Sequence, residues 1–345
     1  MALVHIEGWP DPVEAGRHRI LEAALDAGVP FPHGCGSGEC GSCKCRLLSG
    51  EVKSDRYSPD ALSDDEAAQG LILACRARPL GDVRVQWLSS QAALPMVKID
   101  ARVSGIDRVA RDVVVLTVAL RAGQSFDFRP GQFAKLRFGK LPARSYSMAN
   151  LPGQGQLVFH IRVLPEGKVS GAVASDLRVG DAVEVRGPFG EAFWKGAQSA
   201  PLLLLAGGTG MAPMLSILDA ALRDGQDPQR VHLYHGVRGP GDLYCEDLLR
   251  QRARDKGIRF VPVFADGGAG GERAGHLHEA VAKDFRDFGD AVIHVAGPPP
   301  MVDAVKDLVL HRGASAERIH ADAFYAAEPE KRSLWERITA WGNLE

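Results

Sequence analysis

Four of the six cysteines of this chain fall within eleven residues, and this cluster constrains the fold more than any other feature of the sequence. The cysteines are Cys35, Cys40, Cys43 and Cys45 in the cluster, with Cys75 and Cys245 apart from it. A small secreted domain would spread its cysteines through the chain as disulfides, whereas this chain has 345 residues and begins without a secretory signal pattern. Metal ligation or redox chemistry in a reducing, cytoplasmic location is therefore the better interpretation.

The spacing of these cysteines indicates which metal centre they hold. Cys35, Cys40 and Cys43 follow the pattern C-x4-C-x2-C, and Cys75 supplies a distant fourth thiol. This is the plant-type 2Fe–2S spacing, with three thiolates from one tight loop and one from a separate segment. Glycines in the loop 34–43 would let the backbone wrap closely and adopt positive φ. Structural zinc is the alternative, although zinc sites usually pair two short Cys-x2-Cys units. The remaining cysteines are expected to be small buried thiols: Cys45 and Cys245.

The composition excludes several classes of protein. Hydrophobic residues make up 45% of the chain and charged residues 24%, which is ordinary for a soluble globular protein. A net charge of −2 leaves no basic excess for holding nucleic acid. No apolar stretch reaches the length of a membrane helix, so membrane insertion is not expected. At roughly 100–200 residues per domain, the length predicts two or three domains.

Hydrophobic patterning divides the chain into three units joined by a linker at 89–95. Residues 1–92 combine short alternating strands with a helix over 19–27. Residues 98–198 carry short strands between Gly/Pro turns, which predicts a small antiparallel barrel. Residues 199–326 alternate apolar strands with helices, which predicts a parallel sheet covered on both faces. The strands expected in the last two units span 113–120, 133–138, 157–163, 182–185, 202–206, 231–234, 260–264 and 292–296.

Two glycine turns are placed to bind phosphate. The strand 202–206 runs into Gly207-Gly208-Thr209-Gly210 and then a helix, so the backbone can approach a pyrophosphate with the helix dipole behind it. This turn lacks the G-x-G-x-x-G spacing of the usual dinucleotide fingerprint. Gly167-Lys168-Val169-Ser170 opens a second helical stretch, whose N-terminus also favours phosphate. Tight packing alone is the alternative reading of either turn.

The cysteine loop and these motifs resemble the reductase components of bacterial aromatic-ring and hydrocarbon oxygenase systems. In that family a plant-type 2Fe–2S ferredoxin precedes a ferredoxin–NADP reductase-like unit, and the resemblance covers nearly the whole chain, from about residue 1 to 326. It implies a multidomain protein, in which a β-grasp ferredoxin of the α+β class occupies 1–92. An antiparallel β-barrel that binds FAD follows at 98–198, and an α/β nicotinamide domain with a parallel sheet follows at 199–326.

The resemblance places the flavin on Arg144-Ser145-Tyr146-Ser147, which matches the family's R-x-Y-S signature. Arg144 would neutralise the pyrophosphate of FAD through its planar guanidinium. Tyr146 would offer a flat face to the isoalloxazine, and Ser147 would hydrogen-bond near N5, where the hydride arrives. Tyr146 and Ser147 are therefore the expected catalytic residues. A surface arginine beside a core tyrosine is the alternative for the motif taken alone.

Further flavin contacts are expected from three other segments. His160 and Arg162 share one face of a strand, and the resemblance implies that this strand lies beside the flavin. Taken without the resemblance, His160 is interpreted as a solvated or core histidine. The turn Gly167, Lys168, Val169 and Ser170 would hold the FAD pyrophosphate. Phe324 and Tyr325 are both candidates for an aromatic that covers the flavin, and a packed C-terminal strand is the alternative.

The resemblance places nicotinamide binding at the turn after strand 202–206 and at a second segment, 296–301. The second segment matches the family motif C-G-P-P-x-M except that Ala296 stands where many relatives have cysteine. Arg238 lies where the adenosine ribose of the nicotinamide cofactor would be bound, and an arginine there could favour a cofactor with a 2′-phosphate. We expect NADH, with NADPH as the alternative. The nicotinamide-binding residues implied are Gly208, Thr209, Gly210, Arg238, Gly297 and Pro298.

These sites together predict an electron relay. NADH gives two electrons as one hydride, a 2Fe–2S cluster accepts one at a time, and a flavin can do both. The expected acceptor is a terminal oxygenase of the Rieske-type, aromatic ring-hydroxylating class, or its intermediate Rieske or plant-type ferredoxin. A di-iron hydrocarbon monooxygenase is the alternative acceptor. An iron–sulfur redox sensor is the alternative of another class, and a monomer is the expected assembly.

The distribution of charge and the C-terminal tail suggest how the chain binds a partner. Residues 1–92 hold 13 acidic and 9 basic side chains, so their net charge is −4 and that of the remainder is +2. This predicts docking of the ferredoxin unit through opposite charges. Residues 327–345 form an extension in which apolar residues recur at helical spacing over 331–341. It is expected either to dock on its own chain or to contact a partner.

Overall fold

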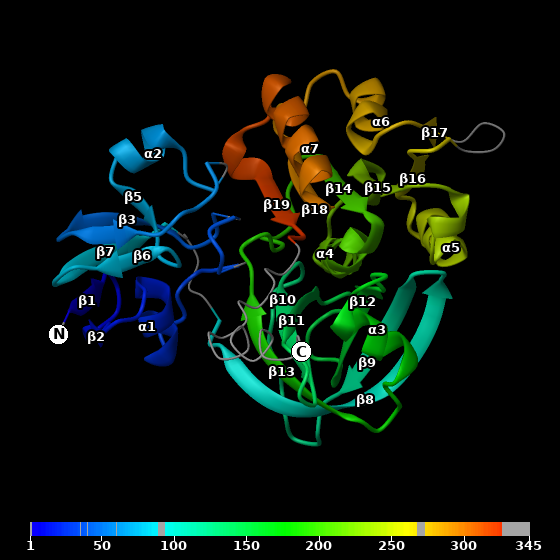
Figure 1. The fold of residues 1–345 in the computed structure, drawn as a ribbon. Coiled ribbons are helices and arrows are strands. Elements are labelled where there is room, and N and C mark those ends of the chain that lie inside the picture. The colour runs from blue at the N-terminus through cyan, green and yellow to red at the C-terminus, as the bar shows by residue number, and fades with distance from the viewer. Residues whose placement is uncertain are drawn as a thin grey trace, which may run out of the picture.

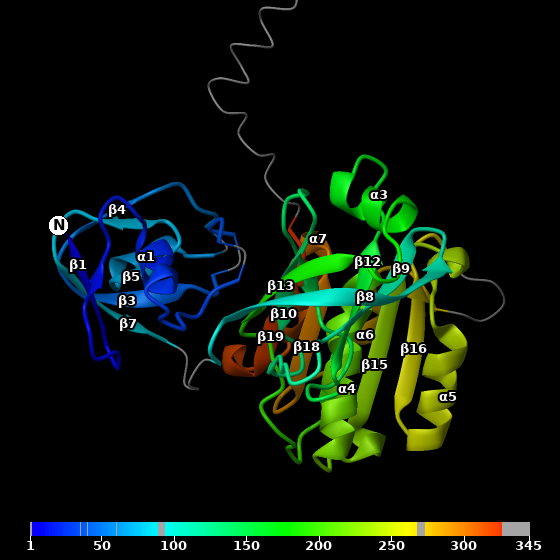
Figure 2. The same cartoon turned by 90° about the horizontal axis from the view of Figure 1, so that it is seen from below.

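Three units follow one another along the chain in the computed structural model, which describes residues 2–34, 36–39, 41–59, 61–88, 94–267 and 273–325. Figure 1 shows them as a blue unit, a cyan-to-green unit and a unit that runs from green to red. In Figure 2 the blue unit stands to one side of the other two, which lie against each other. The predicted tail 327–345 lies outside the described residues, as does most of the predicted linker 89–95.

The N-terminal unit is a mixed sheet with one helix packed on it, the β-grasp arrangement that the resemblance implied. Its strand order is β2-β1-β7-β3-β5, in which β1 and β7 are parallel. Helix α1 buries Ile20, Leu21 and Ala24 in the core, and Gly28 follows its end at φ +77°. The elements are β1 (Leu3–Ile6), β2 (Val13–Glu14), α1 (Ile20–Asp26), β3 (Lys44–Ser49), β4 (Val52–Ser54), α2 (Asp64–Ala68), β5 (Leu71–Leu73), β6 (Ala77–Pro79) and β7 (Val83–Trp87).

The middle unit is an antiparallel barrel, as predicted. Its strand order is β11-β10-β13-β8-β9-β12, and a bridge between Met148 and Phe159 joins the two ends of the sheet. Strand β8 runs for 14 residues and was not predicted; its pairing with β9 shifts register twice, and such bulges bend a strand around a barrel. The elements are β8 (Val97–Ala110), β9 (Val113–Ala119), β10 (Phe133–Phe138), β11 (Arg144–Ser147), β12 (Gln156–Arg162), α3 (Lys168–Ser175) and β13 (Ala182–Phe189).

The third unit is a parallel sheet with helices on both faces, again as predicted. The strand order is β17-β16-β15-β14-β18-β19. Leu202 and Leu204 of β14 pack in the core that holds α4, whereas Leu203 and Leu205 pack in the core that holds α6 and α7. The elements are β14 (Leu202–Gly207), α4 (Met211–Arg223), β15 (Val231–Val237), α5 (Glu246–Lys256), β16 (Arg259–Phe264), β17 (Arg273–Ala274), α6 (Leu277–Asp284), β18 (Val292–Gly297), α7 (Pro299–His311) and β19 (Ile319–Ala323), with short 3₁₀ turns at η1 (Gly208–Gly210), η2 (Pro228–Arg230), η3 (Pro240–Asp242) and η4 (Ala316–Arg318).

The barrel and the parallel sheet share a packed boundary. Val113 of the barrel belongs to the same buried cluster as Leu202 and Met214, and Leu151 packs against it. The hydroxyl of Ser216 on α4 donates a hydrogen bond of 2.7 Å to the carbonyl of Asn150. The carboxyl ends of the strands therefore face the barrel, where α/β sheets place their ligands. No helix within the described ranges combines the length and the apolar character needed to cross a bilayer.

Candidate functional site

The glycine turn after β14 adopts the predicted strand–turn–helix geometry. Gly208–Gly210 forms the 3₁₀ turn η1, and α4 begins at Met211. The turn lies so close to the end of β18 that a Cβ at Gly210 would stand 2.0 Å from the carbonyl oxygen of Ala296. Because no side chain fits there, glycine is required for this packing. The N-terminus of α4 follows directly, so its dipole favours an anion at the turn.

A pocket opens above this turn, between the barrel and the parallel sheet. Its wall brings together several of the predicted nicotinamide residues, namely Gly208, Thr209, Arg238 and Pro298. Gly210 and Gly297 do not line it but pack beneath it. Arg162, which we expected beside the flavin, lies on this wall too, and its Nη1 is 3.8 Å from the position of a Cβ on Gly208. The pocket therefore combines a phosphate-binding turn with two guanidinium groups.

Two carboxylates hold these guanidinium groups in place. Asp112, in the turn between β8 and β9, accepts from Arg162 Nε at 3.1 Å and lies 3.5 Å from Arg238 Nη2. Asp242 lies 3.4 Å from Arg238 Nε. Both aspartates line the pocket. Arg238 is 52% exposed, so its ion pairs orient the side chain more than they stabilise the fold.

A buried polar network supports the turn from below. The Nε2 of His235 lies 3.0 Å from the Gly208 carbonyl, and the Tyr244 hydroxyl lies 3.5 Å from the same oxygen. The Nδ1 of His160, on β12 of the barrel, lies 2.9 Å from the Tyr244 hydroxyl. Burial lowers the pKa of both His160 and His235 to about 4, so both are neutral near pH 7. His160 is thus a buried residue that ties the barrel to the turn.

The R-x-Y-S segment forms strand β11 at the edge of the barrel sheet. Ser147 pairs with Phe133 of β10 and Tyr146 with Ala134. The extended backbone puts Arg144 and Tyr146 on one face and Ser145 and Ser147 on the other. Burial raises the pKa of Tyr146 to about 12, so the phenol stays neutral.

Asp322 is a site residue that sequence reasoning missed. It lies on β19, opposite Ala296 of β18, and the hydroxyl of Ser147 donates to its Oδ2 over 3.4 Å. Although the residue keeps part of its surface exposed, burial of the carboxyl raises its pKa to about 7, and the hydrogen bond from Ser147 offsets this only in part. A carboxyl group that titrates near neutral pH therefore touches the expected catalytic serine. An aspartate between two alanines carries no pattern that would have predicted this contact.

The predicted phosphate turn before α3 also forms. Gly167 precedes the helix, which begins at Lys168. Ser170 turns its hydroxyl back, accepting from the Leu164 amide at 3.1 Å, and Val169 is buried in the barrel core. Because the hydroxyl of Ser170 closes the turn, phosphate binding here would rely on the backbone N–H groups of the first helical turn and on the exposed side chain of Lys168.

The cysteine loop is described in part, because Cys35 and Cys40 lie outside the described residues. Cys43 and Cys75 are buried next to each other along the β3–β5 ladder, where the Ala74 amide donates to the Cys43 carbonyl at 3.1 Å. The loop glycines 36, 38 and 41 all have positive φ, as predicted, and a Cβ at Gly41 would lie 2.9 Å from a backbone oxygen. The loop backbone thus turns tightly and packs closely on the segment around Ala61, which suits a loop that supplies several cluster ligands.

Of the two extra cysteines, Cys45 is buried as expected, whereas Cys245 is only half-buried. Cys45 is fully buried on β3, and burial, with a smaller effect from Cys75, raises the pKa of its thiol to about 12. Cys45 therefore packs as part of the core of the N-terminal unit. Cys245 is half-buried at the start of α5, and burial raises the pKa of its thiol too.

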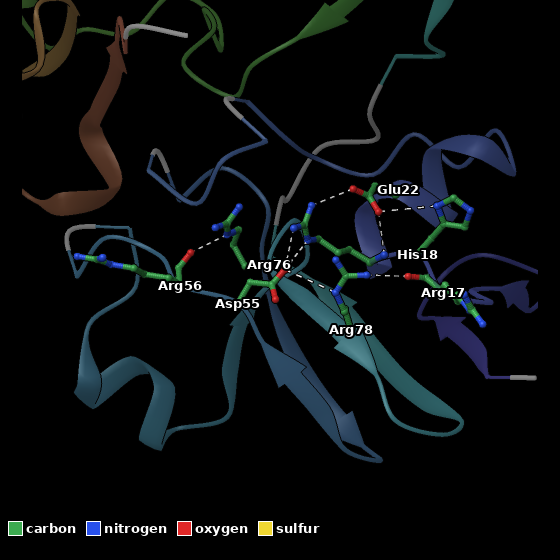
Figure 3. Close-up of polar contacts among 8 residues, drawn as sticks. Arg17, His18, Glu22, Asp55, Arg56, Arg76 and Arg78 are labelled. Atoms are coloured by element: carbon green, nitrogen blue, oxygen red, sulfur yellow. Dashed lines mark hydrogen bonds and ion pairs between the residues drawn. The ribbon is translucent and has the colours of Figure 1, made fainter. Parts of the chain in front are cut away.

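Several arginines of the N-terminal unit gather near Asp55 (Figure 3). The arginines are Arg17, Arg19, Arg56, Arg76 and Arg78. Arg19 lies 2.7 Å from the carboxylate of Asp55 and lowers the pKa of that group, which stays ionised. The side chain of Arg76 lies against the loop, 2.8 Å from the position of a Cβ on Gly38. The N-terminal unit, acidic overall, therefore carries a local group of arginines around Asp55, of which Arg76 contacts the cysteine loop.

Three family models match consecutive parts of the chain. Residues 5–80 match a 2Fe-2S iron-sulfur cluster binding domain, residues 100–194 an oxidoreductase FAD-binding domain, and residues 204–307 an oxidoreductase NAD-binding domain. The three models therefore follow the same order as the three units of the fold.

Relatives of known function match almost the whole chain. The ferredoxin–NAD(P)(+) reductase component of naphthalene 1,2-dioxygenase/salicylate 5-hydroxylase systems from Ralstonia is 34% identical, over 89% of this chain and 93% of its own. The reductase component of propane 2-monooxygenase from Rhodococcus jostii is 32% identical, over 88% and 86%. The crystal structure of a cytochrome P450 reductase from Amycolatopsis superposes with a TM-score of 0.80 at 34% identity, covering 95% of this chain and 100% of that one.

Proposed function

Since the chain belongs to the ferredoxin–NAD(P)(+) reductase components of oxygenase systems, we propose that it carries electrons from NADH through FAD and a 2Fe–2S cluster to a terminal oxygenase. The observation that supports this direction is the presence of all three binding units in one chain, in the same order as the predicted relay. We propose that one monomer completes the relay, with units at 1–92, 98–198 and 199–326.

The division of electrons follows from the chemistry of the groups that these units bind. Bound FAD can take a hydride and release electrons singly, and the cluster takes one electron at a time. The protein's part is to bind the two ends of the relay close together and to hold them in a fixed orientation. Each NADH oxidised therefore supplies two single-electron deliveries to the acceptor.

We propose that the flavin is held by β11 and by the N-terminus of α3. Arg144 would pair with the pyrophosphate, and the first turn of α3 would add backbone N–H groups. Tyr146 would lie against the isoalloxazine, and Ser147 would face its reacting edge. Asp322 then acts through the hydroxyl of Ser147, as a group that can hold or release a proton near pH 7.

We propose that the pocket above η1 takes NADH in preference to NADPH. The turn and Arg162 would bind the pyrophosphate, because a guanidinium group and a helix N-terminus both favour an anion. Arg238 is engaged by Asp112 and Asp242, so its charge is already balanced. Carboxylates at this position accept hydrogen bonds from ribose hydroxyls and repel a 2′-phosphate.

We propose that the acceptor is a Rieske-type aromatic ring-hydroxylating oxygenase or its ferredoxin. The relatives from naphthalene 1,2-dioxygenase systems support this choice, and the relative from propane 2-monooxygenase supports a monooxygenase as the second candidate. The net charge of −4 on residues 1–92 by itself favours a basic partner surface, whereas the local group of arginines around Asp55 supports docking on an acidic surface of the acceptor. The rate of acceptor reduction should then fall as salt is raised, and a rate independent of salt would argue against electrostatic docking.

A visible spectrum and a metal analysis test the proposal directly. The purified protein should contain two irons and one FAD, show absorption from both, and lose both absorptions when NADH is added. A spectrum of flavin alone with bound zinc would support the zinc alternative. A protein whose flavin is reduced while its cluster stays oxidised would refute the relay.

A further inference from the structure

Two described hydrogen bonds join the cysteine loop, or the residue just before it, to the other two units of the chain. The carbonyl of His33 accepts the amide of Gly190, in the barrel, at 3.2 Å. The carbonyl of Glu39 accepts the hydroxyl of Tyr325, which follows β19 of the third unit, at 3.1 Å. His33 lies two residues before Cys35, and Glu39 lies directly before Cys40. Two different units thus hold the segment that carries the cluster ligands.

His33 is fixed from within its own unit. Its ring is buried, and its Nδ1 lies 2.8 Å from the carbonyl of Phe31, so that nitrogen carries the proton. Phe31 is itself 2% exposed and meets Trp87 edge-on at 5.7 Å between ring centroids. The position of the His33 ring is therefore set by the core of the N-terminal unit.

On the barrel side, a chain of residue contacts runs from strand β11 to His33. Its ring contacts Phe189 edge-to-face, with centroids 4.7 Å apart. Phe189 lies 5.6 Å from the ring of Phe133 and pairs with it across β13 and β10. Phe133 pairs with Ser147 of β11. The barrel also fixes Gly190, because the buried side chain of Gln132 donates to its carbonyl at 3.0 Å.

On the other side, the two neighbouring aromatics after β19 diverge. The amide of Phe324 donates to the Gly297 carbonyl at 2.8 Å, and its side chain packs against the cluster that includes Ala296. Tyr325 instead reaches the loop of the N-terminal unit. The two residues expected to cover the flavin therefore make different contacts. Phe324 packs on the parallel-sheet unit, whereas Tyr325 contacts the cysteine loop.

We propose that His33 and Tyr325 are positioning residues that seat the cysteine loop on the barrel and on the third unit, respectively, and that Ser147, Phe133, Phe189 and His33 form the route by which electrons leave the flavin site. The inference rests on the proposed function. In each transfer one electron would move from the reduced flavin to the oxidised cluster, and the acceptor would take it from the cluster before the second transfer. Over the two transfers the flavin would also lose the proton that arrived with the hydride, to the Ser147–Asp322 pair or to water. Contacts that keep the loop seated keep this step fast.

Hydrogen exchange at the Gly190 amide tests the seating without any turnover. The variants are His33→Ala, Phe189→Leu and Tyr325→Phe, and His5→Ala, an exposed histidine on β1 of the same unit, is the control. Loss of one aromatic contact or one hydrogen bond should speed exchange at Gly190 by about fivefold. The control should exchange like the unaltered protein.

Rapid mixing with NADH then separates the two steps. In His33→Ala, flavin reduction should keep its rate while cluster reduction slows, among preparations that retain two irons. If His33→Ala loses its cluster, Phe189→Leu and Tyr325→Phe decide the matter by the same two readouts. Unchanged exchange at Gly190 and unchanged cluster reduction in these variants would overturn the inference. A failure of NADH to reduce the unaltered protein would instead overturn the proposed function.

Discussion

Replacing Tyr244 with phenylalanine tests how the buried network supports nicotinamide binding. The ring volume is retained, so the change removes the hydroxyl that lies 2.9 Å from His160 Nδ1 and 3.5 Å from the Gly208 carbonyl. A buried polar group that loses its partner costs about 1–3 kcal/mol, and we expect the free energy of unfolding to fall by about 2 kcal/mol. If half of that loss weakens the binding of NADH at the turn, the KM for NADH rises about fivefold.

Tyr234→Phe is the matched control for this prediction. Tyr234 is also fully buried and its hydroxyl donates to Asp284, but it does not line the pocket. Both variants should lower the urea midpoint, and only Tyr244→Phe should raise the KM for NADH. Steady-state kinetics with an artificial electron acceptor and urea unfolding measure the two effects. Equal changes in KM for both variants would refute the role assigned to the network.

Three other predictions follow from the site. Folding lowers the pKa of His160 and His235 from about 6.5 to about 4, so the folded protein is fully stable above pH 6.5 and loses stability as the pH falls toward 4. At pH 5 the free energy of unfolding should be lower by about 2 kcal/mol for each histidine, and a thermal midpoint that stays constant from pH 7.5 to 5 would contradict this. Asp242→Asn should shift the ratio of kcat/KM values toward NADPH by about tenfold, the scale of one charge-assisted hydrogen bond, and an unchanged ratio would count against the proposed discrimination. Cys45→Ser should retain two irons per chain while Cys75→Ser loses them, and iron loss in both would assign Cys45 to the cluster.

The elements that the sequence predicted well are those whose pattern reflects one local environment. Strand β10 has the predicted bounds because Phe133, Leu136 and Phe138 are buried in a stretch preceded by a glycine turn. The fully apolar strand β14 predicted a sheet covered on both faces, and its alternate residues do enter two different cores. The positive φ values of the loop glycines followed from the need to wrap a backbone around the cluster.

The features that escaped prediction depend on contacts between distant segments. Strand β8 was missed because its bulges interrupt the alternation of buried and exposed residues. The place of Arg162 on the wall of the pocket above the glycine turn, where Asp112 holds it, was not foreseen, and its contact with the flavin stays a prediction. Asp322 acquires its raised pKa from burial after the third unit has packed on the barrel. None of these properties is encoded within a short stretch of sequence.

The central claim is that one chain divides a hydride into single electrons and passes them through its cysteine loop. Anaerobic mixing with one equivalent of NADH, followed by freezing at set times and electron paramagnetic resonance, tests it most directly. The account predicts that flavin absorption is lost first and that the signal of one reduced 2Fe–2S cluster per chain then grows. A cluster signal that never forms after complete flavin reduction, or that forms before it, would contradict the account.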